Sequence, residues 1–125
     1  RVDCAHIPDL VPILAVAMAA AEGDSRITGA ARLRIKESDR LSAMAAALTA
    51  AGADAAELPD GLAIRGGKTL HAAKIEGCND HRIVMAMAIA SALSDGEWTI
   101  TDAEATAKSA PAFWQEFERL GGRTR

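Results

Sequence analysis

The stretch Arg32-Leu-Arg-Ile-Lys-Glu-Ser-Asp-Arg40 stands where a short strand pattern, Ser25 to Gly29, gives way to a helical pattern that runs to Gly52. Beyond Arg40 the apolar residues recur at helical spacing, and the glycine is a typical helix stop. Ser38 and Asp39 are the candidates for the helix N-cap, because their side-chain oxygens can accept hydrogen bonds from the first backbone N–H groups. The stretch therefore predicts a switch from strand to helix.

The same stretch concentrates four cations and two carboxylates at that switch. Lys36 and Arg40 fall at or just inside the helix N-terminus, where unpaired N–H groups and the positive end of the helix dipole already favour an anion. Glu37 and Asp39 reduce the repulsion within the cluster. The pattern favours a site for a phosphate or a carboxylate, and the alternative is a solvated, charged first turn.

Two similar passages, residues 22–29 and 95–102, contain Gly23 and Gly96, which stand 73 positions apart (96 − 23). Each passage follows an Ala-rich helical pattern, 9–21 or 80–93, and precedes a lysine, Lys36 or Lys108, and a further helix. This order predicts the same unit twice. Chance similarity between two Ala-rich helices is the alternative.

Short strand patterns occupy residues 53–57, 62–65 and 70–75, with a hairpin turn at Pro59-Asp60-Gly61 and a break at Gly66-Gly67. Strands that alternate with helices predict an α/β (α+β) fold with helices packed on mixed sheets. We expect no strand before the first helix, which suggests a fragment of a larger protein whose remainder completes the sheet or the site.

Composition narrows the classes of function. Half of the residues are apolar, as a globular domain with a core requires, and the aromatic residues are two Trp and two Phe. A net charge of −3 and few aromatic rings disfavour binding to nucleic acid. No apolar run reaches the roughly 20 residues of a membrane span. Without a signal-peptide layout, and with two cysteines that show neither disulfide nor metal spacing, we expect a cytoplasmic protein.

Two further polar clusters precede helical patterns. Asn79-Asp80-His81-Arg82 opens the second Ala-rich helix, with Asp80 as the predicted N-cap. Thr106-Ala-Lys108-Ser109 comes before the last helix, for which we predict Ser109 as the cap and Pro111 in the first turn. Each cluster alone is also consistent with an ordinary helix cap beside solvated charges.

Together with Ile7-Pro8-Asp9, these clusters place polar side chains at the start of four predicted helices. If the helices are parallel, one rim gathers side chains that can bind anions and move protons: Asp9, Lys36, Glu37, Arg40, Asp80, His81, Arg82 and Lys108. Neither a Walker loop, nor a G-x-G-x-x-G motif, nor a Cys/His metal cluster is present.

In order and spacing, the motifs Ile7-Pro8-Asp9, Arg34 to Arg40, Asn79 to Arg82 and Thr106 to Ser109 resemble those of the 5-enolpyruvylshikimate-3-phosphate (EPSP) synthase family. The resemblance runs from Asp3 to the end of the chain. It implies two similar domains, each built from three βαβαββ units. The chain would be part of the C-terminal domain, with units at about residues 1–67 and 68–125, and would need the N-terminal domain of its own chain as a partner.

The resemblance also implies the reaction. The family transfers the enolpyruvyl group of phosphoenolpyruvate to the 5-hydroxyl of shikimate 3-phosphate and releases phosphate, in the pathway to chorismate and the aromatic amino acids. It implies no metal and no organic cofactor, and no nucleic-acid or membrane partner. We expect the fragment alone to have no turnover.

The motif positions imply a role for each site residue. Asp9 resembles the proton acceptor, which also binds the shikimate hydroxyls, and Glu37 resembles the proton donor. Lys36 resembles a shikimate 3-phosphate ligand, and Arg32 occupies the position of an asparagine that contacts this substrate in some members. The phosphoenolpyruvate ligands of the family resemble Arg40, Arg82 and Lys108. The residues that support these ligands resemble Asp80 and His81.

Two other interpretations stay open. One is the sister enolpyruvyl transferase that acts on UDP-N-acetylglucosamine, whose usual nucleophilic cysteine and nucleotide contacts are not visible in this sequence. The other is a non-catalytic α/β module that binds phosphorylated metabolites, or a relative that uses the same unit on RNA ends. The acidic charge and scarce aromatic residues weigh against RNA.

Overall fold

The computed structural model describes residues 2–36, 38–94, 96–108, 110–120 and 122. A four-stranded sheet has the order β1-β2-β4-β3, and a second sheet pairs β5 with β6. The strands are β1 (Val2–Asp3), β2 (Asp24–Thr28), β3 (Asp54–Leu58), β4 (Gly61–Arg65), β5 (Lys74–Ile75) and β6 (Thr99–Ile100). The α-helices are α1 (Val11–Ala20), α2 (Arg40–Ala50), α3 (His81–Ala92) and α4 (Phe113–Arg119), and the 3-10 helices are η1 (Pro8–Leu10), η2 (Ala31–Ile35) and η3 (Ala103–Lys108).

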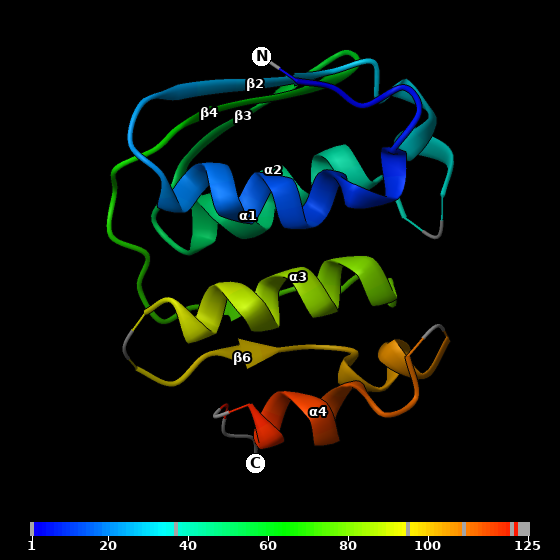
Figure 1. The fold of residues 1–125 in the computed structure, drawn as a ribbon, viewed down its shortest axis with the longest axis vertical. Helices are drawn as coiled ribbons and strands as arrows, with labels where there is room; N and C mark the ends of the chain where they lie inside the picture. Colours follow the sequence, from blue (N-terminus) through cyan, green and yellow to red (C-terminus); the bar gives the residue numbers. More distant parts are fainter. Residues whose placement is uncertain (1, 37, 95, 109, 121, 123–125) are drawn as a thin grey trace.

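The elements stack in layers (Figure 1). The larger sheet covers α1 and α2, which lie side by side, and α3 packs against both of these helices from below. The β5–β6 pair and then α4 lie beyond α3. The layers bury aliphatic side chains such as Leu41, Met44 and Leu48 of α2 and Ile83 and Met87 of α3. Small alanines elsewhere on the helices allow this close helix-on-helix packing.

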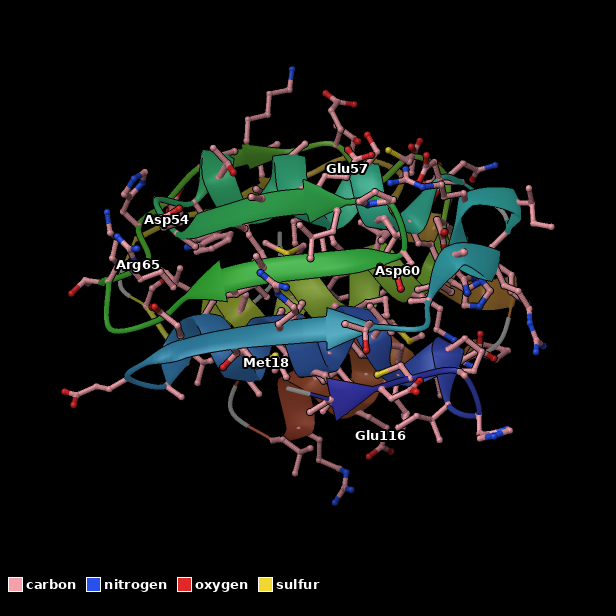
Figure 2. The ribbon with its side chains drawn as sticks, turned by 90° about the horizontal axis from the view of Figure 1, so that it is seen from above. Met18, Asp54, Glu57, Asp60, Arg65 and Glu116 are labelled. Atoms are coloured by element: carbon pink, nitrogen blue, oxygen red, sulfur yellow. The ribbon has the colours of Figure 1, made fainter. Side chains whose placement is uncertain are left out.

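The β3–β4 hairpin closes at Leu58 and Gly61, with Pro59 and Asp60 in the turn, as the sequence predicts. Gly61 lies beside the end of β2 in the same sheet, and a Cβ atom there would clash with the carbonyl oxygen of Ile27. Seen from above, Glu57 and Asp60 mark the turn end of the hairpin and Asp54 and Arg65 mark its other end (Figure 2). Only a glycine lets β4 approach β2 this closely.

Residues that are 73 positions apart in the two similar passages also have similar backbone conformations and strand partners. In the parallel pair β1–β2, Val2 faces Ile27, and in the parallel pair β5–β6, Ile75 faces Ile100. Gly23 and Gly96 have φ angles of 95° and 98°. The positions 29 and 102 also share a positive φ, 72° for the glycine and 58° for the aspartate. Corresponding residues therefore adopt corresponding conformations, and the division into two units of a larger domain stays a prediction.

The structure corrects three expectations about the elements. A strand, β1, does precede the first helix, because Val2 and Asp3 pair with the end of β2. Within residues 70–75 only Lys74 and Ile75 form a strand, since the preceding residues cross between the two sheets. The last helix begins at Phe113 with Ala112 at the cap position, so Pro111 precedes the helix, and Ser109 is outside the described residues.

The other helices and strands lie within about two residues of their predicted positions. Asp39 and Asp80 are the N-caps of α2 and α3, and their carboxylates accept hydrogen bonds from the backbone N–H groups of Ser42 and Arg82. Of the helices described, none is long and apolar enough to cross a membrane.

Candidate active site

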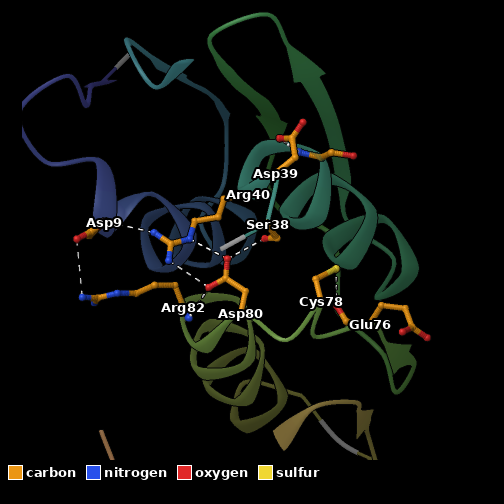
Figure 3. Close-up of polar contacts among 9 residues, drawn as sticks. Asp9, Ser38, Asp39, Arg40, Glu76, Cys78, Asp80 and Arg82 are labelled. Atoms are coloured by element: carbon orange, nitrogen blue, oxygen red, sulfur yellow. Dashed lines mark hydrogen bonds and ion pairs between the residues drawn. The ribbon is translucent and has the colours of Figure 1, made fainter. Parts of the chain in front are cut away.

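The N-terminal ends of α1, α2 and α3 lie on the same side of the molecule, the right side in Figure 1. Each end carries charged residues: Asp9 lies in η1, directly before α1, Arg40 is the first residue of α2, and Asp80 and Arg82 begin α3. These four residues come together in one cluster, although 73 positions separate the first from the last (82 − 9) (Figure 3). The parallel helices thus produce the common rim that the sequence predicts for these residues.

Arg40 is the centre of the cluster. Its side chain is only 3% exposed, and it forms a two-pronged ion pair with Asp80: Nε lies 2.8 Å from Oδ2 and Nη2 lies 3.2 Å from Oδ1. Its Nη1 donates to Oδ1 of Asp9 at 3.2 Å. A cation at a helix N-terminus opposes the helix dipole, and the two carboxylates offset that cost.

Asp80 is completely buried and receives further hydrogen bonds. The Ser38 hydroxyl donates to its Oδ2 at 2.7 Å, and the backbone N–H of Arg82 donates to its Oδ1 at 3.0 Å. Burial alone would raise the pKa of this carboxyl, but the hydrogen bonds from Arg40 and Ser38, with the positive charge of Arg40, outweigh burial and lower the pKa. Asp80 is therefore an anion at neutral pH that fixes Arg40.

The outer part of the cluster faces solvent. The Asp9 side chain is 53% exposed and its Oδ2 lies 3.9 Å from Nη2 of Arg82, whose side chain is 36% exposed. The Nε of Arg82 is buried and has no hydrogen-bond partner in the described part of the chain. Both residues border a groove of about 190 Å³ whose other walls are apolar: Leu10, Pro12, Ile13, Met85, Ala86 and Ile89. Asp9 and Arg82 can thus reach a small ligand with a hydroxyl and an anionic group.

Of the remaining predicted site residues, Lys36 and Arg32 do not join this cluster among the residues described. Lys36, directly after η2, and Arg32, within η2, are both exposed and make no polar contact with the residues described. His81 is buried as the first residue of α3. Glu37 lies outside the described residues, as does the side chain of Lys108, the last residue of η3.

Ser38 also belongs to the cluster, although its place in the sequence indicates only a possible helix cap. Its hydroxyl contact with Asp80 joins residues 42 positions apart. A helix-cap signal is local, so no local pattern in the sequence indicates this contact.

Comparison with known proteins identifies the family. Residues 1–117 match the family model for EPSP synthase (3-phosphoshikimate 1-carboxyvinyltransferase). The chain belongs to the EPSP synthase family. The resemblance that the motifs suggest is therefore confirmed.

Similar proteins agree with this assignment. A 3-phosphoshikimate 1-carboxyvinyltransferase of Clostridium acetobutylicum is 50% identical over 121 residues, which cover 97% of this chain and 28% of the relative. One of Prochlorococcus marinus is 50% identical over 115 residues, which cover 92% of this chain and 26% of the relative. The chain thus spans about a quarter of the length of these curated relatives.

A solved structure of EPSP synthase from Acinetobacter baumannii superimposes with a TM-score of 0.82 and 41% sequence identity, covering 88% of this chain and 26% of that structure. The α/β class predicted from the alternation of helices and strands is confirmed by this similarity and by the helices and mixed sheets of the structure.

Proposed function

We propose that this chain is part of the C-terminal domain of a cytoplasmic 3-phosphoshikimate 1-carboxyvinyltransferase, with units at about residues 1–67 and 68–125. The full-length protein transfers the enolpyruvyl group of phosphoenolpyruvate to shikimate 3-phosphate. Membership of the EPSP synthase family supports the reaction. The observation that carries the proposal is the convergence of Asp9, Arg40, Asp80 and Arg82 at one edge of three helices.

The reaction is an addition followed by an elimination. The 5-hydroxyl oxygen of shikimate 3-phosphate bonds to C2 of phosphoenolpyruvate while C3 gains a proton and the hydroxyl loses one. The bond between C2 and the phosphate oxygen then breaks, and C3 loses a proton, so that phosphate leaves and the enol double bond forms again. Such a reaction needs a base, an acid at carbon and cations for two anionic groups.

Asp9 and Arg82 suit the roles at the solvent side of the cluster. Asp9 accepts the hydroxyl proton, because its half-exposed carboxylate is held by Arg40 and can meet a substrate hydroxyl. Arg82 pairs with the carboxylate or phosphate of phosphoenolpyruvate, for which a guanidinium offers a two-pronged contact. Arg40, held by Asp80, is a second cation for phosphoenolpyruvate, and His81, the first residue of α3, supports the site.

The other assigned residues complete the site. Glu37 donates the proton to C3, Lys36 and Arg32 contact shikimate 3-phosphate, and Lys108 contacts phosphoenolpyruvate. The exposure of Lys36 and Arg32 supports a role in which the substrate provides their partner. The N-terminal domain of the same chain supplies further ligands, so the 125-residue chain alone has no turnover. The reaction requires no metal and no organic cofactor.

Phosphate release by the full-length protein tests this function. We expect release only when both substrates are present, and none when UDP-N-acetylglucosamine replaces shikimate 3-phosphate. Glu37→Gln should lower kcat by at least about 100-fold, because general acid catalysis typically contributes that much. Glu22→Gln, at an exposed turn after α1, is the matched control and should retain the unaltered rate.

Three results would contradict the proposal. Activity with the UDP sugar would indicate the sister transferase. Substrate binding without any turnover in the unaltered protein would indicate a binding module. A Glu37→Gln variant as active as Glu22→Gln would remove the assigned proton donor.

A further inference from the structure

The segment 35–38 connects η2 to the cap of α2 and includes two residues of the proposed site, Lys36 and Glu37. The side chain of Ile35 is 84% exposed and that of Lys36 is also exposed. These two side chains therefore contribute little packing that could hold the segment in place. Among the described residues, the contacts that hold it come from its flanks.

On its C-terminal flank, the segment is fixed by Ser38 and by the helix cap. Ser38 donates to Asp80 at 2.7 Å, and Oδ1 of Asp39 accepts the backbone N–H of Ser42 at 3.2 Å. Figure 3 shows Ser38 directed toward Asp80 in the ion-pair cluster. This flank is thereby attached to α2 and α3.

On its N-terminal flank, Arg34 makes four hydrogen bonds with residues from two other places in the chain. Its Nη1 donates to Oδ2 of Asp39 at 2.9 Å and to Oε2 of Glu57 at 2.6 Å. Its Nε donates to the carbonyl oxygen of Pro59 at 3.1 Å, and its Nη2 donates to that of Leu58 at 2.7 Å. One guanidinium thus joins the β3–β4 turn to the cap residue of α2.

The contact between Arg34 and Asp39 spans the segment from end to end. Because both ends are tied to each other and to the hairpin, the distance that residues 35–38 must bridge is fixed. The arrangement depends on a planar group with several donors in fixed directions. A lysine ammonium can pair with one of the two carboxylates, but it cannot reproduce the fork toward the two carbonyl oxygens.

We infer that Arg34 is a positioning residue: it holds the segment that carries Lys36 so that this side chain meets the shikimate 3-phosphate. The inference rests on the proposed function for the identity of the ligand. Arg34 is not a catalytic residue, since its guanidinium is occupied by Asp39, Glu57 and the hairpin carbonyl groups.

The test compares Arg34→Gln and Arg34→Lys with Arg65→Gln in the full-length protein. Arg65 is the matched control, because it is an exposed arginine at the other end of the same hairpin that pairs only with Asp24, at 3.4 Å, among the described residues (Figure 2). Misplacement of the segment should lower kcat/KM for shikimate 3-phosphate at least about tenfold in Arg34→Gln. Arg34→Lys should recover part of this loss.

The pattern of constants separates positioning from a general loss of structure. The KM for phosphoenolpyruvate should change less than the KM for shikimate 3-phosphate, because Arg40 and Arg82 are held by separate contacts. Loss of folded protein would instead lower the apparent kcat and leave both KM values unchanged. If kcat/KM for Arg34→Gln stays within about twofold of that for Arg65→Gln, the inference is wrong.

Amide hydrogen exchange gives a measurement that does not need turnover. In Arg34→Gln we expect faster exchange confined to residues 35–39, and in Arg65→Gln we expect none there. Unchanged exchange in both variants overturns the inference, whether or not the protein is active. Absence of phosphate release from the unaltered protein, in contrast, overturns the proposed function and leaves the exchange result to decide the positioning role.

Discussion

The substitution Asp80→Asn measures how strongly the buried ion pair stabilises this fold. Asp80 is completely buried and the Arg40 side chain is 3% exposed, so water does not screen the pair. Removing one charge from such a pair costs about 3–5 kcal/mol, because the other charge stays buried without compensation. Asparagine is as good an N-cap as aspartate, so the cap of α3 should survive. Since Asp9 still compensates Arg40 in part, we expect a loss of about 3 kcal/mol.

Urea unfolding of the full-length protein at pH 7, followed by circular dichroism, measures this loss. Asp9→Asn is the matched control, because Asp9 also pairs with Arg40 but is 53% exposed. Ion pairs of exposed groups contribute at most about 1 kcal/mol, so the control should lose no more than that. Equal losses for the two variants would show that burial does not determine the strength of the pair.

The difference in free energy of unfolding between the unaltered protein and Asp80→Asn should also depend on pH. The pKa of Asp80 in the folded protein is lowered from its ordinary value of 3.8, so its contribution is complete above that value. The contribution disappears as the pH falls from there through the lowered pKa of the folded state. The unaltered protein and Asp80→Asn should therefore converge in stability in acid, and a difference that persists unchanged to pH 2 would contradict the charged state of Asp80.

Three further predictions concern separate features. Arg82→Gln should raise the KM for phosphoenolpyruvate at least about tenfold in the phosphate-release assay, since a hydrogen bond to a charged group contributes about 1.5–3 kcal/mol, and it should leave the urea midpoint nearly unchanged. Gly61→Ala should lower the free energy of unfolding by more than Gly23→Ala does, because it places a Cβ against the Ile27 carbonyl oxygen. At Gly23, which has a φ of 95°, a Cβ meets open space, so the substitution costs only about 1–2 kcal/mol of backbone strain. Burial and nearby carboxylates raise the pKa of the Cys78 thiol, so its alkylation by iodoacetamide at pH 8, measured by mass spectrometry, should be slower than that of a cysteine peptide.

Most of the regular elements could be predicted from the sequence, because the signals that set them are local. The caps Asp39 and Asp80 and the turn at Pro59-Asp60 depend on a few neighbouring residues, and each is found where the local pattern indicates. One short strand, β1, escaped prediction for the same reason. The strand β1 consists of Val2 and Asp3, too few residues for a periodic pattern, and it forms because β2 offers an edge with which to pair.

The candidate site depends both on local sequence signals and on the packing of distant elements. Residue types and spacing indicate the starts of the helices and the family, but they do not show which charges meet. Arg40 pairs with a carboxylate 40 positions later, and Arg34 bonds to residues 23 to 25 positions away. Lys36 belongs to the same charged stretch and yet takes no part in the cluster.

The amino-acid pattern alone thus specifies the helices and the hairpin of this chain, since hydrogen bonding and side-chain packing over one or two turns are sufficient to set them. The pairing of charges is specified only when α1, α2 and α3 pack in parallel, because burial between the helices removes the water that would otherwise screen these charges and leaves Asp80 as the partner that Arg40 needs.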